Sequence, residues 1–332
     1  MTKYVSNENL KTVKAAWKGT PVDEKGRFAN HEFPFKHNFI KLLKWQLGRN
    51  PQSLEKRFDI SRIEVINPTS FLNSEDNGIL WLGHASFFIR LNGTNILLDP
   101  VFGYPPFLKR FVDVPSPIEK LDKINFILVS HDHRDHADKA SIQKLTQKFP
   151  NAKILAGLGM EDLINVWKTP TNKAQTAGWY QEFSDSDEVQ ITFVPVRHWS
   201  RRVLNDMNKR LWGGFVIQSK ETTIYFSGDT GYGGHFRELA KVFPKIDYFI
   251  VGIGAYSPDF VMKEIHQTPE EAIQGFLDSK AKYLIPMHYR TFDLTNEPPS
   301  EPLRRLNEAA EKLNIADRLR ILKIYESLII KM

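Results

Sequence analysis

The chain reads Ser-His-Asp-His-Arg-Asp-His-Ala-Asp at residues 130–138, which places His131, His133, Asp135 and His136 within six residues. His131 directly follows the largely apolar run at residues 125–130, which is typical of a buried strand. Side chains two apart point the same way in an extended strand end, so His131 and His133 can bind one metal ion. The turn that follows can direct Asp135 and His136 towards a second ion. The stretch therefore predicts a metal site, and a dinuclear one.

Three further candidate ligands come just after predicted strands. His198 follows the apolar run at residues 190–196, Asp229 follows residues 222–226, and His288 follows residues 282–287. In a layered fold, catalytic residues gather where loops leave a rigid sheet. We therefore expect these three side chains to join the cluster at residues 131–136.

The order of these residues resembles the ligand series of the metallo-β-lactamase fold: His-x-His-x-Asp-His, an isolated His, a Gly-Asp and a last His. Other motifs resemble the phospholipase D family that hydrolyses N-acyl-phosphatidylethanolamine. They are Trp-Leu-Gly-His-Ala-Ser at residues 81–86, Gly-Asp-Thr-Gly-Tyr at residues 228–232 and Ile-Gly-Ala-Tyr at residues 253–256. The likeness runs from residue 78 to residue 315, with a weaker echo at residues 38–60.

The resemblance implies two zinc ions and the following ligands: His131, His133 and His198 for one ion, Asp135, His136 and His288 for the other, and Asp229 for both. Nitrogen and oxygen donors suit zinc, and manganese or iron would also accept them because none of the donors is soft. The chain contains no cysteine, so it cannot form the thiolate-bound second site of true β-lactamases. This difference argues against turnover of β-lactams as the main activity.

A hydroxide that bridges the two ions is the expected nucleophile, because one bound zinc ion already lowers the pKa of water to about 7, and a pair can also hold the attacked and leaving oxygens. Ser86 lacks the spacing of a serine-hydrolase nucleophile. We expect His84 and Asp99 to orient the ligand imidazoles. The resemblance also places His266 beside the metals, where it would donate a hydrogen bond or a proton to the reacting group. The expected catalytic residues are Asp135, Asp229 and His266.

The resemblance implies an α/β chain with the four-layer αββα sandwich of the metallo-β-lactamase fold, which composition alone could not distinguish from other α/β folds. Asn92-Gly93 predicts a hairpin between strands at residues 87–91 and 95–98. Helices are expected at residues 138–149, from Thr268 onwards and at residues 302–313, with a late strand at residues 319–330. We expect residues 61–332 to form the catalytic domain, with residues 1–60 as an N-terminal arm and an amphipathic segment packed on the core.

The amphipathic segment spans residues 33–49, where aromatic and aliphatic residues alternate with lysine and arginine. Such a stretch can lie in a lipid interface. The alternative, which we favour, is a helix whose apolar face packs on the sandwich. Residues 1–30 carry few apolar groups, and we expect them to form a loosely held arm.

The net charge is +6 over 332 residues, but the charged residues are scattered, which is typical of a solvated exterior. We therefore expect no nucleic-acid partner. No leader peptide or membrane-spanning stretch is apparent, so a cytoplasmic protein is expected, with peripheral contact to a membrane through residues 33–49 as an addition. The expected partner is a small-molecule or phospholipid substrate, and the sequence allows a homodimer.

These expectations describe a dinuclear, zinc-dependent hydrolase of lipid metabolism. The resemblance implies a phospholipase D-like phosphodiesterase that acts on N-acyl-phosphatidylethanolamine-like phospholipids. Two alternatives stay open: a hydrolase of lactones, amides or thioesters with the same fold, and a non-catalytic metal-binding regulator.

Overall fold

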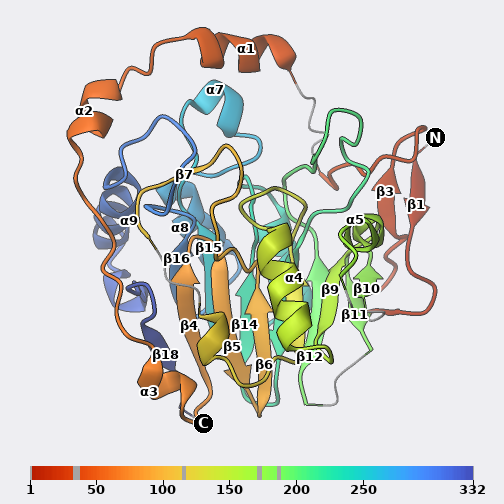
Figure 1. Cartoon of the computed structure of the whole chain (residues 1–332). Coiled ribbons are helices and arrows are strands. Elements are labelled where there is room, and N and C mark those ends of the chain that lie inside the picture. Colours follow the sequence, from red (N-terminus) through yellow and green to blue (C-terminus); the bar gives the residue numbers. More distant parts are fainter. Residues whose placement is uncertain (1, 33–37, 114–116, 170–173, 185–187, 332) are drawn as a thin grey trace.

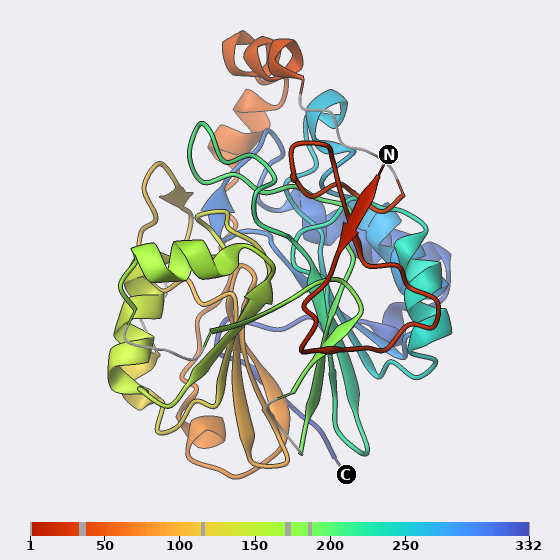
Figure 2. The same cartoon turned by 90° about the vertical axis from the view of Figure 1, so that its right-hand side faces the viewer.

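Strands are arranged in two seven-stranded sheets that face each other, and helices cover the outer face of each (Figure 1 and Figure 2). This arrangement confirms the predicted four-layer αββα sandwich. The computed structural model describes residues 2–32, 38–113, 117–169, 174–184 and 188–331. Within these ranges, no helix has both the length and the apolar character needed to cross a lipid bilayer.

The first sheet has the strand order β10-β9-β8-β6-β5-β4-β18. Its strands are β4 (Gly78–Gly83), β5 (Ser86–Leu91), β6 (Thr94–Leu98), β8 (Phe126–Val129), β9 (Lys153–Gly157), β10 (Ala174–Ala177) and β18 (Ser327–Ile329). Asn92 and Gly93 both have positive φ and join β5 to β6, which confirms the predicted hairpin. The pairs from β6 to β10 are parallel, and α4 (Lys139–Lys148) and α5 (Met160–Val166) cover this sheet (Figure 2).

The second sheet has the order β16-β15-β14-β13-β12-β11-β2. Its strands are β2 (Lys11–Thr12), β11 (Gln181–Phe183), β12 (Gln190–Val194), β13 (Gly214–Gln218), β14 (Thr223–Phe226), β15 (Tyr248–Gly252) and β16 (Tyr283–Met287). Its outer face carries α6 (His235–Val242), α8 (Pro269–Asp278) and α9 (Glu301–Lys312). Thr268 and Glu271 form a capping box at the start of α8, as the sequence predicts.

The hydrophobic core lies between the sheets. Phe87 of β5 meets Phe226 of β14 across this layer, with ring centroids 6.3 Å apart. Strands such as β8 and β14 are buried along their whole length, which explains their uninterrupted apolar sequences.

The predicted late strand at residues 319–330 is wrong in its length, because only Ser327–Ile329 forms a strand. Leu319 makes an isolated bridge to Leu284 at the edge of the second sheet. β18 instead pairs with β4 of the first sheet. The segment crosses from one sheet to the other, so it cannot be a single strand.

Residues 2–32 are tied to the sandwich, in contrast to the loosely held arm that we expected. β1 (Lys3–Val5) pairs with β3 (Thr20–Val22), and β2 forms the edge of the second sheet beside β11. Leu10, Val22 and Phe28 are buried. The separation of the chain into two parts at residue 60 stays a prediction.

Two helices, α1 (Phe39–Leu47) and α2 (Ser53–Phe58), lie above the sheets (Figure 1). α1 contacts α7 (Asp259–Met262), and the Trp45 indole N–H donates to Asn296 Oδ1 over 2.9 Å. Ile40 and Leu47 are about four-fifths exposed, at 78% and 79%. This placement differs from the expected packing on the sandwich, because α1 contacts α7 and leaves Ile40 and Leu47 exposed to solvent. Residues 33–37 of the amphipathic segment lie outside the described residues.

The remaining elements are short. They are α3 (Thr69–Leu72), the 3₁₀ helices Ile118–Lys120 and Ala316–Arg318, and a two-stranded sheet formed by β7 (Lys109–Arg110) and β17 (Phe292–Asp293).

Candidate metal centre

The structure brings all seven predicted ligands together where strands of both sheets end. His131 and His133 come from the loop after β8, and His198 comes from the loop after β12. Asp229 follows β14, and His288 directly follows β16. The sheets therefore fix the ligands from opposite sides.

The first group of ligand atoms consists of three imidazole nitrogens and one carboxylate oxygen. His133 Nδ1 lies 2.9 Å from His131 Nε2 and 3.2 Å from His198 Nε2. Asp229 Oδ2 lies 3.8 Å from both His131 Nε2 and His198 Nε2. These four atoms lie within 4.8 Å of one another, close enough to hold one metal ion.

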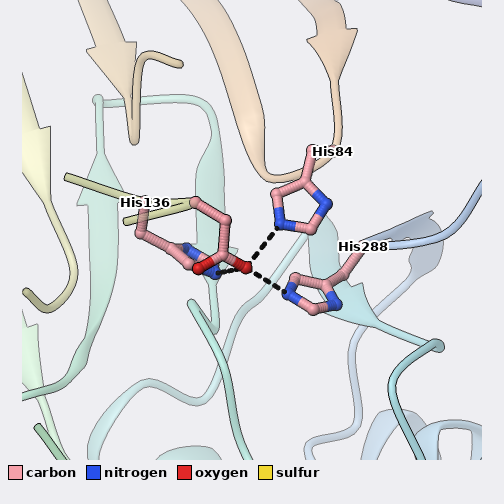
Figure 3. Close-up of side chains that lie close together, drawn as sticks. His84, His136 and His288 are labelled. Carbon is pink, nitrogen blue, oxygen red and sulfur yellow. Dashed lines mark hydrogen bonds and ion pairs between the residues drawn. The ribbon is translucent and has the colours of Figure 1, made fainter. Parts of the chain in front are cut away.

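The second group surrounds Asp135 Oδ2. Figure 3 shows His84, His136 and His288 directed towards one carboxylate oxygen. The Nε2 atoms of these histidines lie 3.1, 3.6 and 3.5 Å from Asp135 Oδ2, respectively. Asp229 joins this group as well, since its Oδ1 lies 3.1 Å from His288 Nε2 and its Oδ2 lies 3.1 Å from His136 Nε2. Asp229 thus contacts histidines of both groups.

Hydrogen bonds on the far side of the imidazoles fix their orientation. Asp99 Oδ2 lies 2.7 Å from His136 Nδ1, and the Ile265 carbonyl oxygen lies 2.8 Å from His198 Nδ1. Ser130 Oγ lies 2.9 Å from His131 Nδ1 and donates to Asp99 Oδ2 over 2.6 Å. The Nε2 atoms of His131, His136 and His198 therefore face the cluster. Hydrogen-bond partners at Nδ1 also raise the basicity of a ligand imidazole. The predicted role of Asp99 agrees with these contacts.

His84 lies differently from what we expected, because its Nε2 contacts the Asp135 carboxylate. Its ring also lies 4.0 Å from that of His288, measured between centroids. The His288 backbone N–H donates to the His84 carbonyl over 3.1 Å, so the two loops are joined. His84 therefore orients a carboxylate and forms part of the second group.

The donor set fits metal ions. His136 Nε2, His288 Nε2 and Asp229 Oδ1 are buried, and apart from the ion-pair contacts among His136, His288 and the carboxylates they have no hydrogen bond of normal geometry within the described part of the chain. Buried polar atoms are almost always paired, and unpaired ones need an explanation. Imidazole nitrogens and carboxylate oxygens that converge in this way are typical ligands of zinc and related cations.

Electrostatics within the cluster divides the histidines into two kinds. Burial lowers the pKa of His131 and His198 well below the ordinary value, so both rings are neutral at pH 7. Burial alone would also lower the pKa of His288, but Asp229 and Asp135 outweigh it and raise that pKa to about 9. The same carboxylates hold the pKa of His136 well above its ordinary value. Without metal, protons on His136 and His288 balance the two carboxylates.

A cavity of about 480 Å³ lies over the cluster. Its floor contains His133, Asp135 and Asp229, and Arg134 and Arg201 contribute positive charge. Its walls come from α1, α7 and three loops, and most of the wall residues are apolar: Leu42, Trp45, Phe107, Leu108, Phe260, Val261, Met262, Ile265 and Leu294. The cavity suits a molecule with an anionic group and an apolar part.

His266 lines this cavity beside the metal ligands, as predicted. Its ring centroid lies 5.2 Å from that of His198 and 5.5 Å from that of His288. It sits in the turn between α7 and α8, and its backbone N–H donates to the Met262 carbonyl over 2.8 Å. Burial lowers the pKa of His266 to about 4.

Sequence reasoning missed several residues around the cluster. Lys41, Leu42 and Trp45 belong to a segment that we expected to pack on the sheets, but they line the cavity. Asn30 hydrogen-bonds to the backbone of His198. A single asparagine in a polar stretch gives no signal of such a contact, which only the tertiary structure creates.

Comparisons with known proteins agree with this geometry. A family model described as a β-lactamase superfamily domain matches residues 94–289. The chain is 29% identical over 295 residues to N-acyl-phosphatidylethanolamine-hydrolyzing phospholipase D 1 of Caenorhabditis elegans, with 83% of each chain covered. It is 28% identical over 237 residues to a metal-dependent hydrolase of Caldivirga maquilingensis, with 69% of this chain and 88% of that protein covered.

Solved structures share the fold at lower sequence identity. Isothiocyanate hydrolase from Delia radicum gut bacteria superposes with a TM-score of 0.62 at 19% identity, covering 76% of this chain and 99% of that chain. This likeness concerns the fold alone.

Proposed function

Because the chain belongs to the β-lactamase superfamily of metal-dependent hydrolases, we propose that it is a zinc-dependent phosphodiesterase for N-acyl-phosphatidylethanolamine-like phospholipids. The observation that carries the proposal is the position of Asp229. Its two carboxylate oxygens face two groups of ligands at the floor of a largely apolar cavity. The similar protein from C. elegans is named for this activity.

In this proposal the ligands hold two zinc ions: His131, His133 and His198 hold one, Asp135, His136 and His288 hold the other, and Asp229 contacts both. Manganese or iron could occupy the same nitrogen and oxygen donors. When bound, such an ion pair lowers the pKa of a shared water to about 7 and neutralises charge on phosphoryl oxygens. Asp135 and Asp229 act by holding and charge-balancing the ions.

The cavity can hold both parts of a phospholipid. A phosphodiester carries a negative charge, which Arg134 and Arg201 at the cavity wall attract. An acyl chain can lie between α1 and α7, where Leu42, Trp45 and Met262 form apolar walls. The chain's own residues thus place the phosphorus near the cluster and exclude water from the apolar part.

His266 supplies a hydrogen-bond donor in this arrangement. Since its pKa is about 4, the ring is neutral at pH 7 and carries one N–H. Nearby cations would lower this pKa further. The N–H can donate to a phosphoryl or leaving oxygen held between His198 and His288, which stabilises charge that develops there.

We also propose that the face around the cavity mouth rests on an anionic membrane. Ile40, Leu43 and Leu47 are exposed on α1, and Phe107 at the mouth is 97% exposed. Lys41 and Lys44 are interspersed among the apolar residues of α1, a pattern typical of interfacial helices. Lipid could then pass from the bilayer into the cavity.

Vesicle binding tests the membrane part of the proposal. Leu47→Asp should weaken sedimentation with phosphatidylserine-containing vesicles, because it places a charge in the apolar face. Val166→Asp is the matched control, since Val166 is similarly exposed, at 74% against 79% for Leu47, but lies on α5. Equal binding by both variants would remove the membrane part without affecting the phosphodiesterase.

A hydrolysis panel tests the activity itself. Zinc-loaded protein should cleave N-acyl-phosphatidylethanolamine in preference to a lactone, an amide, a thioester and a β-lactam. Faster turnover of lactones, amides or thioesters would identify a different hydrolase with the same fold. Absence of turnover on every substrate, with metal bound, would favour a non-catalytic metal-binding regulator.

A further inference from the structure

His198 does not directly follow the strand that precedes it in the chain. β12 ends at Val194, and His198 comes four residues later. By comparison, His288 directly follows Met287, the last residue of β16. The sheet alone therefore fixes the backbone of His198 less directly than that of His288.

Contacts on two sides hold the loop that carries His198. On one side it pairs with the loop of Asp229, since the Gly231 backbone N–H donates to the Arg197 carbonyl over 2.8 Å. On the other side it pairs with Asn30. The Asn30 amide donates from Nδ2 to the His198 carbonyl over 2.9 Å, and Asn30 Oδ1 accepts from the His198 backbone N–H over 3.2 Å.

Asn30 is itself held firmly. It is buried at 8% exposure, and the chain is tied on both sides of it. Before it, the Phe28 backbone N–H donates to the Asn208 carbonyl over 2.8 Å. After it, Glu32 Oε2 accepts from the Gly234 backbone N–H over 2.7 Å. The N-terminal arm thus offers the amide of Asn30 at a fixed position.

We propose that Asn30 is a positioning residue that holds His198 in place to bind metal. A side-chain amide presents one donor and one acceptor side by side, so it can pair with both backbone groups of a single residue. Alanine pairs with neither group, and aspartate cannot donate to the carbonyl. Since the His198 ring is fully buried and its Nδ1 is held by Ile265, a shift of its backbone would move Nε2 away from His131 and His133.

The inference rests on the metal-binding part of the proposed function and not on the substrate. It concerns a residue that lies outside the matched family domain at residues 94–289. The arm would then be part of the metal centre rather than an appendage to it.

The experiment compares Asn30→Ala and Asn30→Asp with the control Asn7→Ala. Asn7 lies in the same arm, and its Nδ2 donates over 2.8 Å to the carbonyl of Thr176. Thr176 belongs to β10 of the first sheet, whereas His198 follows β12 of the second sheet. Zinc affinity is measured by competition with a chromophoric chelator, and the cobalt-loaded proteins are compared by visible absorption. Thermal unfolding of each metal-free protein reports any purely structural effect.

Both Asn30 variants should bind one of the two zinc ions about 10–100-fold more weakly, as is typical when a partner of a ligand is removed. The cobalt spectrum should change for that ion, and Asn7→Ala should keep the wild-type affinity and spectrum. If both Asn30 variants bind zinc with wild-type affinity, the inference is wrong but the proposed metal centre is unaffected. The same holds if Asn7→Ala weakens zinc binding as much as the Asn30 variants do. A wild-type chain that binds no zinc would overturn the proposed metal centre and the inference with it.

Discussion

Asp99 Oδ2 lies 2.7 Å from His136 Nδ1, and neither side chain is exposed to solvent. The same carboxylate accepts from the Ser130 backbone N–H over 2.7 Å and from Ser130 Oγ over 2.6 Å. Three donors therefore converge on Asp99, and the carboxylate fixes His136 with Nε2 towards Asp229. Asp99 therefore anchors both Ser130, where the loop after β8 begins, and His136 within that loop.

Asp99→Asn should weaken metal binding about 10–100-fold, because an amide has one acceptor oxygen and cannot satisfy three donors. Chelator competition measures the change. Asp138→Asn is the matched control, since Asp138 caps α4 nearby and asparagine is an equally good cap. Equal affinity in both variants would contradict the role of Asp99.

Asp229→Asn should lower the bound metal from about two equivalents to less than one, because paired ions share this carboxylate. The loss of one negative charge also leaves the remaining ligands less able to balance two cations. Elemental analysis after zinc reconstitution measures the effect. Retention of both ions would show that Asp229 does not bridge them, and a wild-type content below one equivalent would contradict the dinuclear centre.

Metal affinity should fall as the pH falls. His288 has a pKa of about 9 and His136 a pKa well above its ordinary value, so both rings are protonated at pH 7 without metal. A metal ion must displace these protons, and apparent affinity should drop about tenfold per pH unit for each proton displaced. Calorimetry in buffers of different ionisation enthalpy counts the protons, and absence of proton release at pH 7 would contradict the assignment.

His266→Ala should lower turnover about tenfold or more with metal content unchanged, because the neutral ring donates to the reacting group without binding an ion. His266→Gln should retain part of the rate, since its amide keeps an N–H donor. Turnover and metal content are measured together. Loss of metal would make His266 a ligand, and unchanged turnover would exclude a catalytic role.

Gly228→Ala should destabilise the fold more than Gly93→Ala. Both glycines have positive φ, of +57° and +73°, so alanine costs about 1–2 kcal/mol at either position. At Gly228 a Cβ would also lie 2.7 Å from Ser130 Cβ, whereas Gly93 has open space around it. Crowding of this kind adds about 1–3 kcal/mol. Denaturant unfolding of the metal-free variants gives both values, and equal losses would contradict the clash.

The strands and the clustering of the seven candidate ligands could be predicted because each depends on local sequence. Apolar runs ending in His131, Asp229 or His288 indicate both the strand and the site at its end. The metallo-β-lactamase fold was predicted correctly through the order of these motifs. The local sequence pattern is sufficient to predict a strand that is buried on both faces, because such a strand is apolar along its whole length.

The arm and the cavity walls could not be predicted, because they depend on contacts between distant segments. Leu10 and Phe28 are isolated apolar residues in the sequence, yet both are buried in the folded chain. Trp45 looked like a core residue of an amphipathic helix, but its indole is held by Asn296 and faces the cavity. Asn30 gained its role only through the position of His198.

The pairing of the N-terminal arm with β11 sets the order in which the protein can be completed during synthesis. The Asn7 backbone N–H donates to Gln181, 174 residues further along the chain. At about 5–20 residues per second, Asn7 is added to the chain roughly 9–35 s before Gln181. Asn30 can likewise pair with His198 only after His198 has been synthesised. The last candidate ligand, His288, is added later still. The arm therefore docks late, and the metal centre is finished only when most of the polypeptide has been made.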